Sequence, residues 1–173
     1  MLKIFKKYFI QNKNNKKNNS GFSIVEVVIA IAIALMFFSS IYSIIFFSNQ
    51  TMHRALRKTE AVQFAQEGIE IVRTIKNVSW TDDIATLTSG TVYYPVLVGD
   101  LWTLSTISQP LINGTFTRTI SIYAVNRDAN DDIAVVGTDD PKTKRVVVTV
   151  SWVEKSVTNS VVLETYLTNF LNN

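Results

Sequence analysis

The chain has no cysteine among its 173 residues and only one histidine, His53. The absence of cysteine excludes disulfide frameworks, thiol nucleophiles and zinc sites of the cysteine type. His53 has no second histidine with which to share a metal ion, so we interpret it as an ordinary helix residue. A globular part of this protein must therefore be held together by its apolar core alone.

Acidic residues are missing from residues 1–21, which contain six lysines. Without these lysines the chain keeps 11 basic residues against 14 acidic ones, and its net charge changes from +3 to −3. The basic character thus belongs to a leader, and direct nucleic-acid binding is not expected because it depends on positive charge at phosphates. A lysine cluster ahead of a membrane span also favours a cytoplasmic leader and an exported C-terminal part.

Glycine and proline are absent from Phe22 to Glu67, so neither residue interrupts a helix there. Residues 22–47 carry a single charge, Glu26. As a helix they would measure about 39 Å, enough to cross a hydrocarbon core of about 30 Å. A conventional signal peptide has a shorter apolar region, and the A-x-A site at Ala30–Ala32 lies inside the run instead of after it. The segment therefore predicts a membrane-spanning helix.

The helical pattern continues beyond the apolar segment as an amphipathic stretch. Apolar residues recur there at spacings of three and four, at Val62, Ala65, Ile69 and Val72, and Leu56, Phe64 and Ile75 widen that side. Gly68 weakens the pattern by about 1 kcal/mol relative to alanine, unless a neighbouring backbone packs against it. We predict one continuous helix from about Ser23 to about Lys76.

After Asn77 the composition is typical of strands and turns, with many threonine, serine, valine, glycine and aromatic residues. Gly99-Asp100 indicates a turn between two short strands, and Pro95 restricts the first of them to a sheet edge. Asn113-Gly114 indicates a hairpin turn, and we expect a further turn over residues 154–160. The expected strands are Val92–Val98, Leu101–Ile107, Thr115–Val125, Arg145–Val153 and Val161–Leu167.

These elements predict an α+β fold in which a long N-terminal helix packs on a C-terminal antiparallel sheet. The expected division of the chain is a leader (1–21), a transmembrane or fibre-core helix (22–47), its amphipathic continuation (48–77) and a globular sheet domain (78–173).

Residues 126–144 are rich in aspartate, and we expect a polar loop there. Asp128, Asn130 and Asp132 match the opening of a calcium loop, but the glycine and glutamate that an EF-hand needs later are replaced by Ile133 and Asp139. A solvated loop is the favoured interpretation, with these three residues, aided by Asp131, Asp139 and Asp140, as weak metal candidates. Acidic pairs such as Glu67/Glu70 lack a nucleophile or a phosphate-binding loop beside them, so no enzymatic activity and no cofactor are expected.

The stretch Gly21-Phe22-Ser23-Ile24-Val25-Glu26 joins the basic leader to the apolar run. It resembles the processing site of type IV prepilins, and residues 65–77 and 143–152 resemble minor pilins of the PilV-like type. The resemblance implies cleavage after Gly21 by a prepilin peptidase, methylation of the Phe22 amine, and a role for Glu26 in assembly. A carboxylate there costs about 2.5–3.5 kcal/mol at the bilayer centre, and the implied assembly partner that neutralises it is a neighbouring subunit's N-terminus.

Many major pilins carry glycine and proline within the apolar segment, whereas Leu35–Ser43 has neither. Ser39, Ser40 and Ser43 are expected to bend the helix only mildly by bonding back to carbonyls. The favoured function is thus a minor pilin, with other pilins, the peptidase, the assembly platform and the membrane as partners, and the cytoplasmic membrane and then an extracellular pilus as its location. The alternatives are a type II secretion pseudopilin, a pilus-tip module for adhesion or DNA uptake, and an anchored domain that never polymerises.

Overall fold

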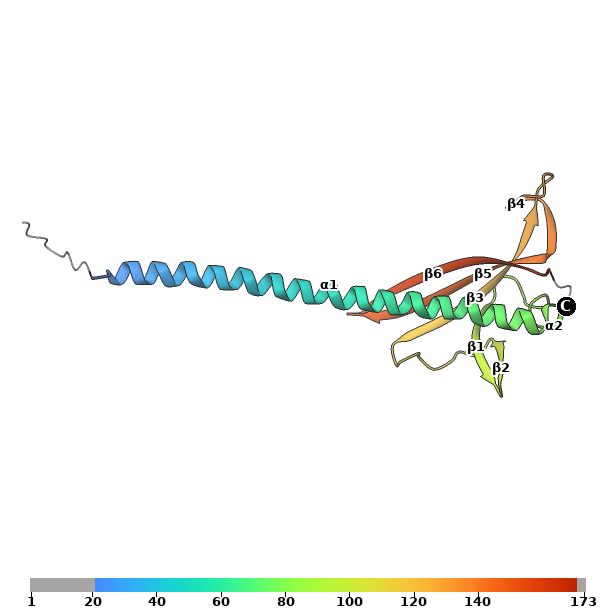
Figure 1. The fold of residues 1–173 in the computed structure, drawn as a ribbon, viewed down its shortest axis with the longest axis horizontal. Coiled ribbons are helices and arrows are strands. Elements are labelled where there is room, and N and C mark those ends of the chain that lie inside the picture. The colour runs from blue at the N-terminus through green and yellow to red at the C-terminus, as the bar shows by residue number, and fades with distance from the viewer. Residues whose placement is uncertain (1–20, 171–173) are drawn as a thin grey trace, which may run out of the picture. The chain divides into compact units, whose positions relative to one another are not determined.

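The computed structural model describes residues 21–170, so most of the expected leader lies outside the described residues (Figure 1). It contains two helices and six strands: α1 (Ile24–Val78), α2 (Trp80–Asp83), β1 (Val92–Val98), β2 (Leu101–Ser105), β3 (Phe116–Arg127), β4 (Ile133–Ala134), β5 (Thr138–Glu154) and β6 (Val157–Thr168). The chain forms two compact units, and the division between them falls inside α1, between Asn49 and Gln50. The α+β class and the long N-terminal helix are confirmed.

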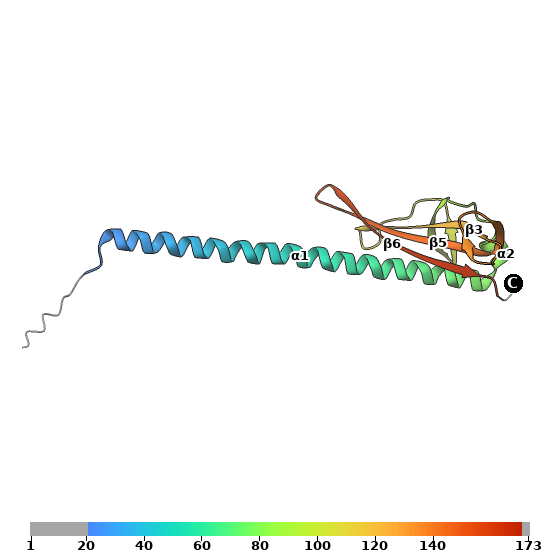
Figure 2. The same ribbon diagram turned by 90° about the horizontal axis from the view of Figure 1, so that it is seen from above.

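The strands form one antiparallel sheet with the order β2-β1-β3-β5-β6, and β4 pairs with β3 away from this path. The two long central strands, β3 and β5, carry alternating buried residues on the face toward α1. This alternation is what a sheet with one covered face requires. In Figure 2, β3, β5 and β6 lie along the C-terminal part of α1.

The edge position expected for the strand with Pro95 is wrong, because β1 lies between β2 and β3. Pairing between β1 and β3 involves only Val92 and Tyr93, so the side of β1 away from β2 has no strand partner at Pro95 among the described residues. A missing backbone N–H is tolerated there for this reason. The β2 strand also ends earlier than predicted, at Ser105, whose Oγ accepts the N–H of Ile107.

Small residues line the face of α1 that packs on the sheet. Ala61, Ala65 and Gly68 are buried at spacings of four and three, and Val72 and Ile75 continue the same stripe. The predicted stripe is confirmed at Ala65, Val72 and Ile75. Val62 and Ile69 flank the core half-buried, and the neighbouring Ala61 and Gly68 are buried instead. Small side chains let the helix backbone approach the strands closely, while the sheet supplies the bulk of the core.

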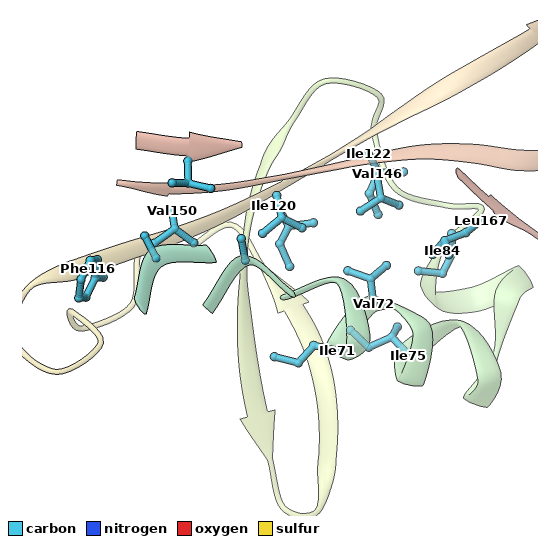
Figure 3. Packing of buried hydrophobic residues seen from close by; sticks show 14 of the residues in the cluster. Ile71, Val72, Ile75, Ile84, Phe116, Ile120, Ile122, Val146, Val150 and Leu167 are labelled. Atoms are coloured by element: carbon cyan, nitrogen blue, oxygen red, sulfur yellow. The ribbon is translucent and has the colours of Figure 1, made fainter. Parts of the chain in front are cut away.

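The core is built between this stripe and the inner face of β3 and β5. Figure 3 shows Val72 of α1 lying toward Ile120 and Val146 of the sheet. At one end Phe116 contacts both Phe64 and Trp152, with ring centroids 5.3 and 5.8 Å apart. The remaining buried apolar residues include Ile71, Ile75, Trp80, Ile84, Ile122, Val148, Val150, Val161 and Leu167.

Gly68 lies where α1 and the sheet are closest. A Cβ atom at this position would stand 2.7 Å from Cγ1 of Val148 and 3.1 Å from Cδ of Arg118. Arg118 is buried in the same place, where its Nη1 donates to the carbonyl of Phe64 at 3.2 Å and pairs with Glu67 at 3.0 Å. The packing that offsets the helical cost of Gly68 therefore comes from side chains of the sheet rather than from a neighbouring backbone.

The turn between β5 and β6 is shorter than predicted, because only Lys155 and Ser156 separate the two strands. Both residues have positive φ, 48° and 66°, as a two-residue type I′ hairpin requires. Asn-Gly is the usual sequence of such a turn, whereas Lys-Ser carries no turn signal. A non-glycine residue in this conformation costs about 1–3 kcal/mol, which the twelve paired positions between the strands offset.

The predicted polar loop over residues 126–144 is also too long. Strand β3 continues to Arg127 and β5 begins at Thr138, so the loop covers residues 128–137 and contains β4. The Arg127 side chain reaches across the two strands to Asp140, with Nε 2.7 Å from Oδ2. This ion pair lets polar residues continue the strands beyond the apolar core.

Substitution of Gly68 by alanine should lower the stability of the sheet domain. The added methyl group forces a shift costing about 1–3 kcal/mol, which exceeds the roughly 1 kcal/mol gained in helix propensity. Val148→Ala in the same chain removes the clashing atoms, so the two changes together should destabilise less than their sum. Thermal unfolding of the detergent-solubilised chain measures this, with Gln66→Ala on the exposed side of α1 as the control. An additive double variant would contradict the packing explanation.

Candidate functional site

The first turn of α1 contains Glu26, and Ser23 lies immediately before the helix. The carbonyl of Ser23 accepts the N–H of Val27 at 3.2 Å, which makes Ser23 the N-cap and Glu26 the third residue of the helix. Serine and glutamate at these two positions match the capping box, a pattern that the sequence analysis did not use. The positive end of the helix dipole also favours a carboxylate there. Glu26 is thus suited to the helix start independently of any partner.

Gly21 and Phe22 precede the helix in an irregular segment and are exposed, Phe22 to 81%. A Cβ atom at Gly21 would meet no atom within 4 Å, and the backbone there is outside the left-handed region. Neither space nor backbone conformation therefore requires glycine at this position in the described structure. The peptide bond between Gly21 and Phe22 is accessible from outside, which is what a processing enzyme needs.

The apolar side chains of α1 before Gln50 are all exposed within the structure. The most exposed include Ile24, Leu35, Met36, Phe37, Phe38, Tyr42, Ile44 and Phe47. Among the described residues, α1 is the one helix long and apolar enough to cross a membrane. An apolar surface of this extent needs a cover, which a lipid bilayer or other apolar helices provide.

Three serines in this segment satisfy their hydroxyl groups within the helix, as the sequence analysis expected. Ser39 and Ser40 both donate to the carbonyl of Met36, at 2.8 and 2.9 Å, and Ser43 donates to the carbonyl of Ser39 at 2.9 Å. Polar groups in hydrocarbon are costly unless they are bonded internally. These bonds make the serines compatible with an apolar environment.

The weak metal candidates lie in the loop between β3 and β5. Oδ1 of Asp128 accepts the N–H groups of Asn130 and Asp132, at 2.8 and 3.1 Å, so it stabilises the turn itself. The guanidinium of Arg127 is 3.6 Å from Asp131 and 2.7 Å from Asp140, so positive charge is already present among these carboxylates. Within residues 21–170 no three metal-ligating side chains of the histidine, cysteine or carboxylate type converge.

The ion pair between Arg127 and Asp140 changes the proton affinity of both groups. The hydrogen bond from Arg127 is the main cause that holds the pKa of Asp140 below its usual value of 3.8, with further bonds from Thr143 and from the N–H of Lys142. The same bond raises the pKa of Arg127 above its usual value. Asp140 is half-buried, and its ionised carboxylate accepts the bond from Arg127 that connects the two strands.

Comparison with known proteins gives one family match. Residues 16–42 match the prokaryotic N-terminal methylation motif, which covers the end of the leader, Gly21, Phe22, Glu26 and most of the apolar segment. This match supports a type IV pilin-like prepilin that is processed and anchored in a membrane. The motif is one of structural subunits and not of an enzyme family. No curated protein and no solved structure matches the chain.

The ion pair between Arg127 and Asp140 should make the stability of the sheet domain depend on pH. The pKa of Asp140 is lower in the folded state, so its contribution is complete above the unfolded pKa near 3.8 and is lost as the pH falls through the folded pKa. At neutral pH, Asp140→Asn should destabilise the chain by about 1–2 kcal/mol. That difference should shrink below about pH 4. Thermal unfolding followed by circular dichroism tests this, with the exposed neighbour substitution Asp139→Asn as the control. An equal loss at all pH values would contradict the assigned role.

Proposed function

We propose that the protein is a structural subunit of a type IV pilus or a related fibre, and that a prepilin peptidase cleaves it after Gly21. The methylation motif at residues 16–42 carries this proposal. The exposed Gly21-Phe22 bond and the uncovered apolar helix behind it support it. Cleavage would separate the lysine-rich leader from an acidic subunit.

The proposed topology follows from the leader. Its lysines favour the cytoplasmic side, so the sheet domain would be exported while the apolar part of α1 spans the membrane. The assembly platform would then transfer the subunit from the lipid into a fibre. There the apolar helices of neighbouring pilins would cover the exposed residues of α1, replacing the lipid.

Glu26 is proposed to guide this transfer. Cleavage creates a free amine at Phe22, and methylation of a basic amine retains its positive charge. The carboxylate of Glu26 and the terminal amine of a neighbouring subunit carry opposite charges, and their attraction is strong where water is excluded. An uncompensated carboxylate within a bundle of apolar helices would be costly, so correct stacking is favoured over other registers.

A minor subunit is the form of this function that we favour. Helix α1 runs without interruption from Ile24 to Val78, and residues 35–43 contain no glycine or proline that would allow the segment to unwind within a fibre. The serine bonds to Met36 and Ser39 retain the helical hydrogen bonding. A subunit with an intact helix is suited to a terminal section of the fibre, in which several copies of this chain would follow one another before the partly unwound subunits begin.

Mass spectrometry of the mature protein tests the processing step. The N-terminal residue should be Phe22 carrying an added methyl group. Gly21→Val should leave the leader attached, while the sheet domain folds normally because a side chain at position 21 meets open space. An intact leader on the wild-type chain, or cleavage at another bond, would contradict the proposal.

The amount of protein in sheared fibres tests the role of Glu26. Glu26→Ala and Glu26→Gln should both be inserted and processed, but both should reduce fibre recovery at least about tenfold, equivalent to about 1.4 kcal/mol. Glutamine is the informative variant, because it retains the capping-box pattern with Ser23 but has no charge. Recovery of Glu26→Gln at the wild-type level would assign Glu26 to helix capping alone.

A further inference from the structure

Two valines stand out on the surface of the sheet domain. Val135 and Val136 are 95% and 83% exposed, the highest values of any large apolar residue from Gln50 to Phe170. They lie in the loop of residues 128–137, named here the valine loop, beside strand β4 (Figure 1). Exposed apolar side chains at a protruding position are candidates for contact with another molecule.

The valine loop is held in place by its own contacts. Asn126 donates to the carbonyl of Val135 at 3.2 Å, and Nη1 of Arg127 donates to the carbonyl of Asp131 at 2.7 Å. Gly137 lies so close to the carbonyl of Arg127 that a Cβ atom there would collide with it. A surface ordered before binding loses less conformational entropy when it binds. The contacts of the loop backbone therefore hold the two valines at fixed, exposed positions.

The valine loop and the residues that flank it carry a negative net charge. One arginine and five aspartates between Arg127 and Asp140 give this stretch a net charge of −4. Arg127 pairs with Asp131 and Asp140, which leaves the charges of Asp128, Asp132 and Asp139 in excess. A partner for the loop must therefore offer an apolar surface bordered by positive charge.

Such a surface occurs at the other end of β5. A groove of about 560 Å³, named here the basic groove, is lined by Arg54, Lys58, Trp152, Glu154, Lys155, Val157, Asn159 and Ser160. Val157, 61% exposed, is the apolar side chain that the groove offers, whereas Trp152 is buried beneath it. Three basic side chains, those of Arg54, Lys58 and Lys155, face a single acidic one, that of Glu154. Contacts of Arg54 with Glu154 at 3.8 Å and of Lys155 with Gln50 at 3.4 Å connect the helix to the turn between β5 and β6.

The valine loop cannot reach the basic groove of its own chain. The 17 residues of β5 separate them, which corresponds to roughly 55 Å of extended strand. Figure 1 shows β4 and the turn between β5 and β6 at opposite ends of β5. Two complementary surfaces at opposite ends of one domain give a head-to-tail contact, which produces open filaments instead of closed dimers.

We propose that the valine loop of one copy docks into the basic groove of the next copy. Val135 and Val136 contact Val157 and the aliphatic parts of the lysine side chains of the groove, while the aspartates of the loop face its basic groups. This inference rests on the proposed function as a fibre subunit. It names the partner of the domain, a second copy of this chain, and the contact that stacks consecutive copies.

The lack of cysteine in the chain allows a direct test by cross-linking. Ala129→Cys in the valine loop and Ser160→Cys in the basic groove both replace small residues at exposed positions. With both substitutions in one chain, bis-maleimide treatment of intact cells should give a ladder of dimers, trimers and longer products. Each single variant has only one of the two cysteines that the cross-linker joins, so it should give no ladder. Co-expression of the two single variants should give a dimer only.

Removal of the docking residues should abolish the ladder. Val135→Ser with Val136→Ser should reduce products larger than the dimer at least about tenfold, because the buried apolar area is lost. The matched control is Val98→Ser with Leu101→Ser, which changes two other exposed apolar residues at the turn between β1 and β2 and should leave the ladder unchanged. Lys58→Glu, which reverses a charge in the groove, should also weaken it.

Mass spectrometry of the cross-linked bands identifies the partner. Bands that contain only this chain support the proposal, and bands that join it to a different pilin overturn it, as does a chain that remains monomeric. The uncross-linked chain in sheared fibres is measured in parallel. Presence in fibres without a ladder refutes the docking contact but retains the proposed function, whereas absence of the processed chain from fibres refutes the proposed function.

Discussion

The close packing of α1 on β3 and β5 is the contact on which the sheet domain depends. Gly68 lies against Val148 and Arg118, and Ala61 and Ala65 continue the same narrow stripe. With no disulfide in the chain, this seam holds the helix to the sheet through non-covalent contacts, most of them apolar packing. Its tightness explains why small residues occupy the centre of the helix face and β-branched residues occupy the strands. The same seam positions Arg54 and Lys58 beside the turn between β5 and β6, and so forms one wall of the basic groove.

Arg118 adds a polar element to this apolar seam. Its Nη1 bonds to the carbonyl of Phe64 and to Glu67, whereas its Nε has no hydrogen-bond partner in the structure. Buried ion pairs contribute little net stability, since desolvation offsets their attraction. Their better attested effect is to favour one arrangement over others. A buried guanidinium that must meet Glu67 disfavours sliding of α1 along the sheet by one helical turn, which apolar contacts alone would tolerate.

The elements that could be predicted from the sequence were those with strong, local signals. The long helix follows from 46 consecutive residues without glycine or proline, and the inner faces of β3 and β5 follow from alternation at Ile120, Ile122, Val146 and Val148. Ala61 and Gly68 of the helix stripe were missed because alanine and glycine add little to a hydrophobic pattern, although close packing requires them. The Lys155-Ser156 turn was missed because pairing of long strands imposed a conformation that neither residue favours. The length of β5 depended on a contact between Arg127 and Asp140, thirteen residues apart, which no local pattern reveals. At the candidate site, Gly21, Phe22 and Glu26 came from a motif, whereas the start of the helix after Ser23, which places Ser23 and Glu26 at the positions of a capping box, came from the first bond of the helix.

The hydroxyl groups of Ser39, Ser40 and Ser43 have a consequence for how such a helix changes its surroundings. Each already donates to a carbonyl of its own helix, so none requires a partner in lipid or in a bundle of neighbouring helices. Moving the segment from one apolar medium to the other leaves this hydrogen bonding unchanged and replaces only dispersion contacts of similar strength. The exchange is then nearly balanced in free energy. A nearly balanced exchange can be directed by one group whose energy differs between the two media, and between residues 22 and 47 the single formal charge is that of Glu26.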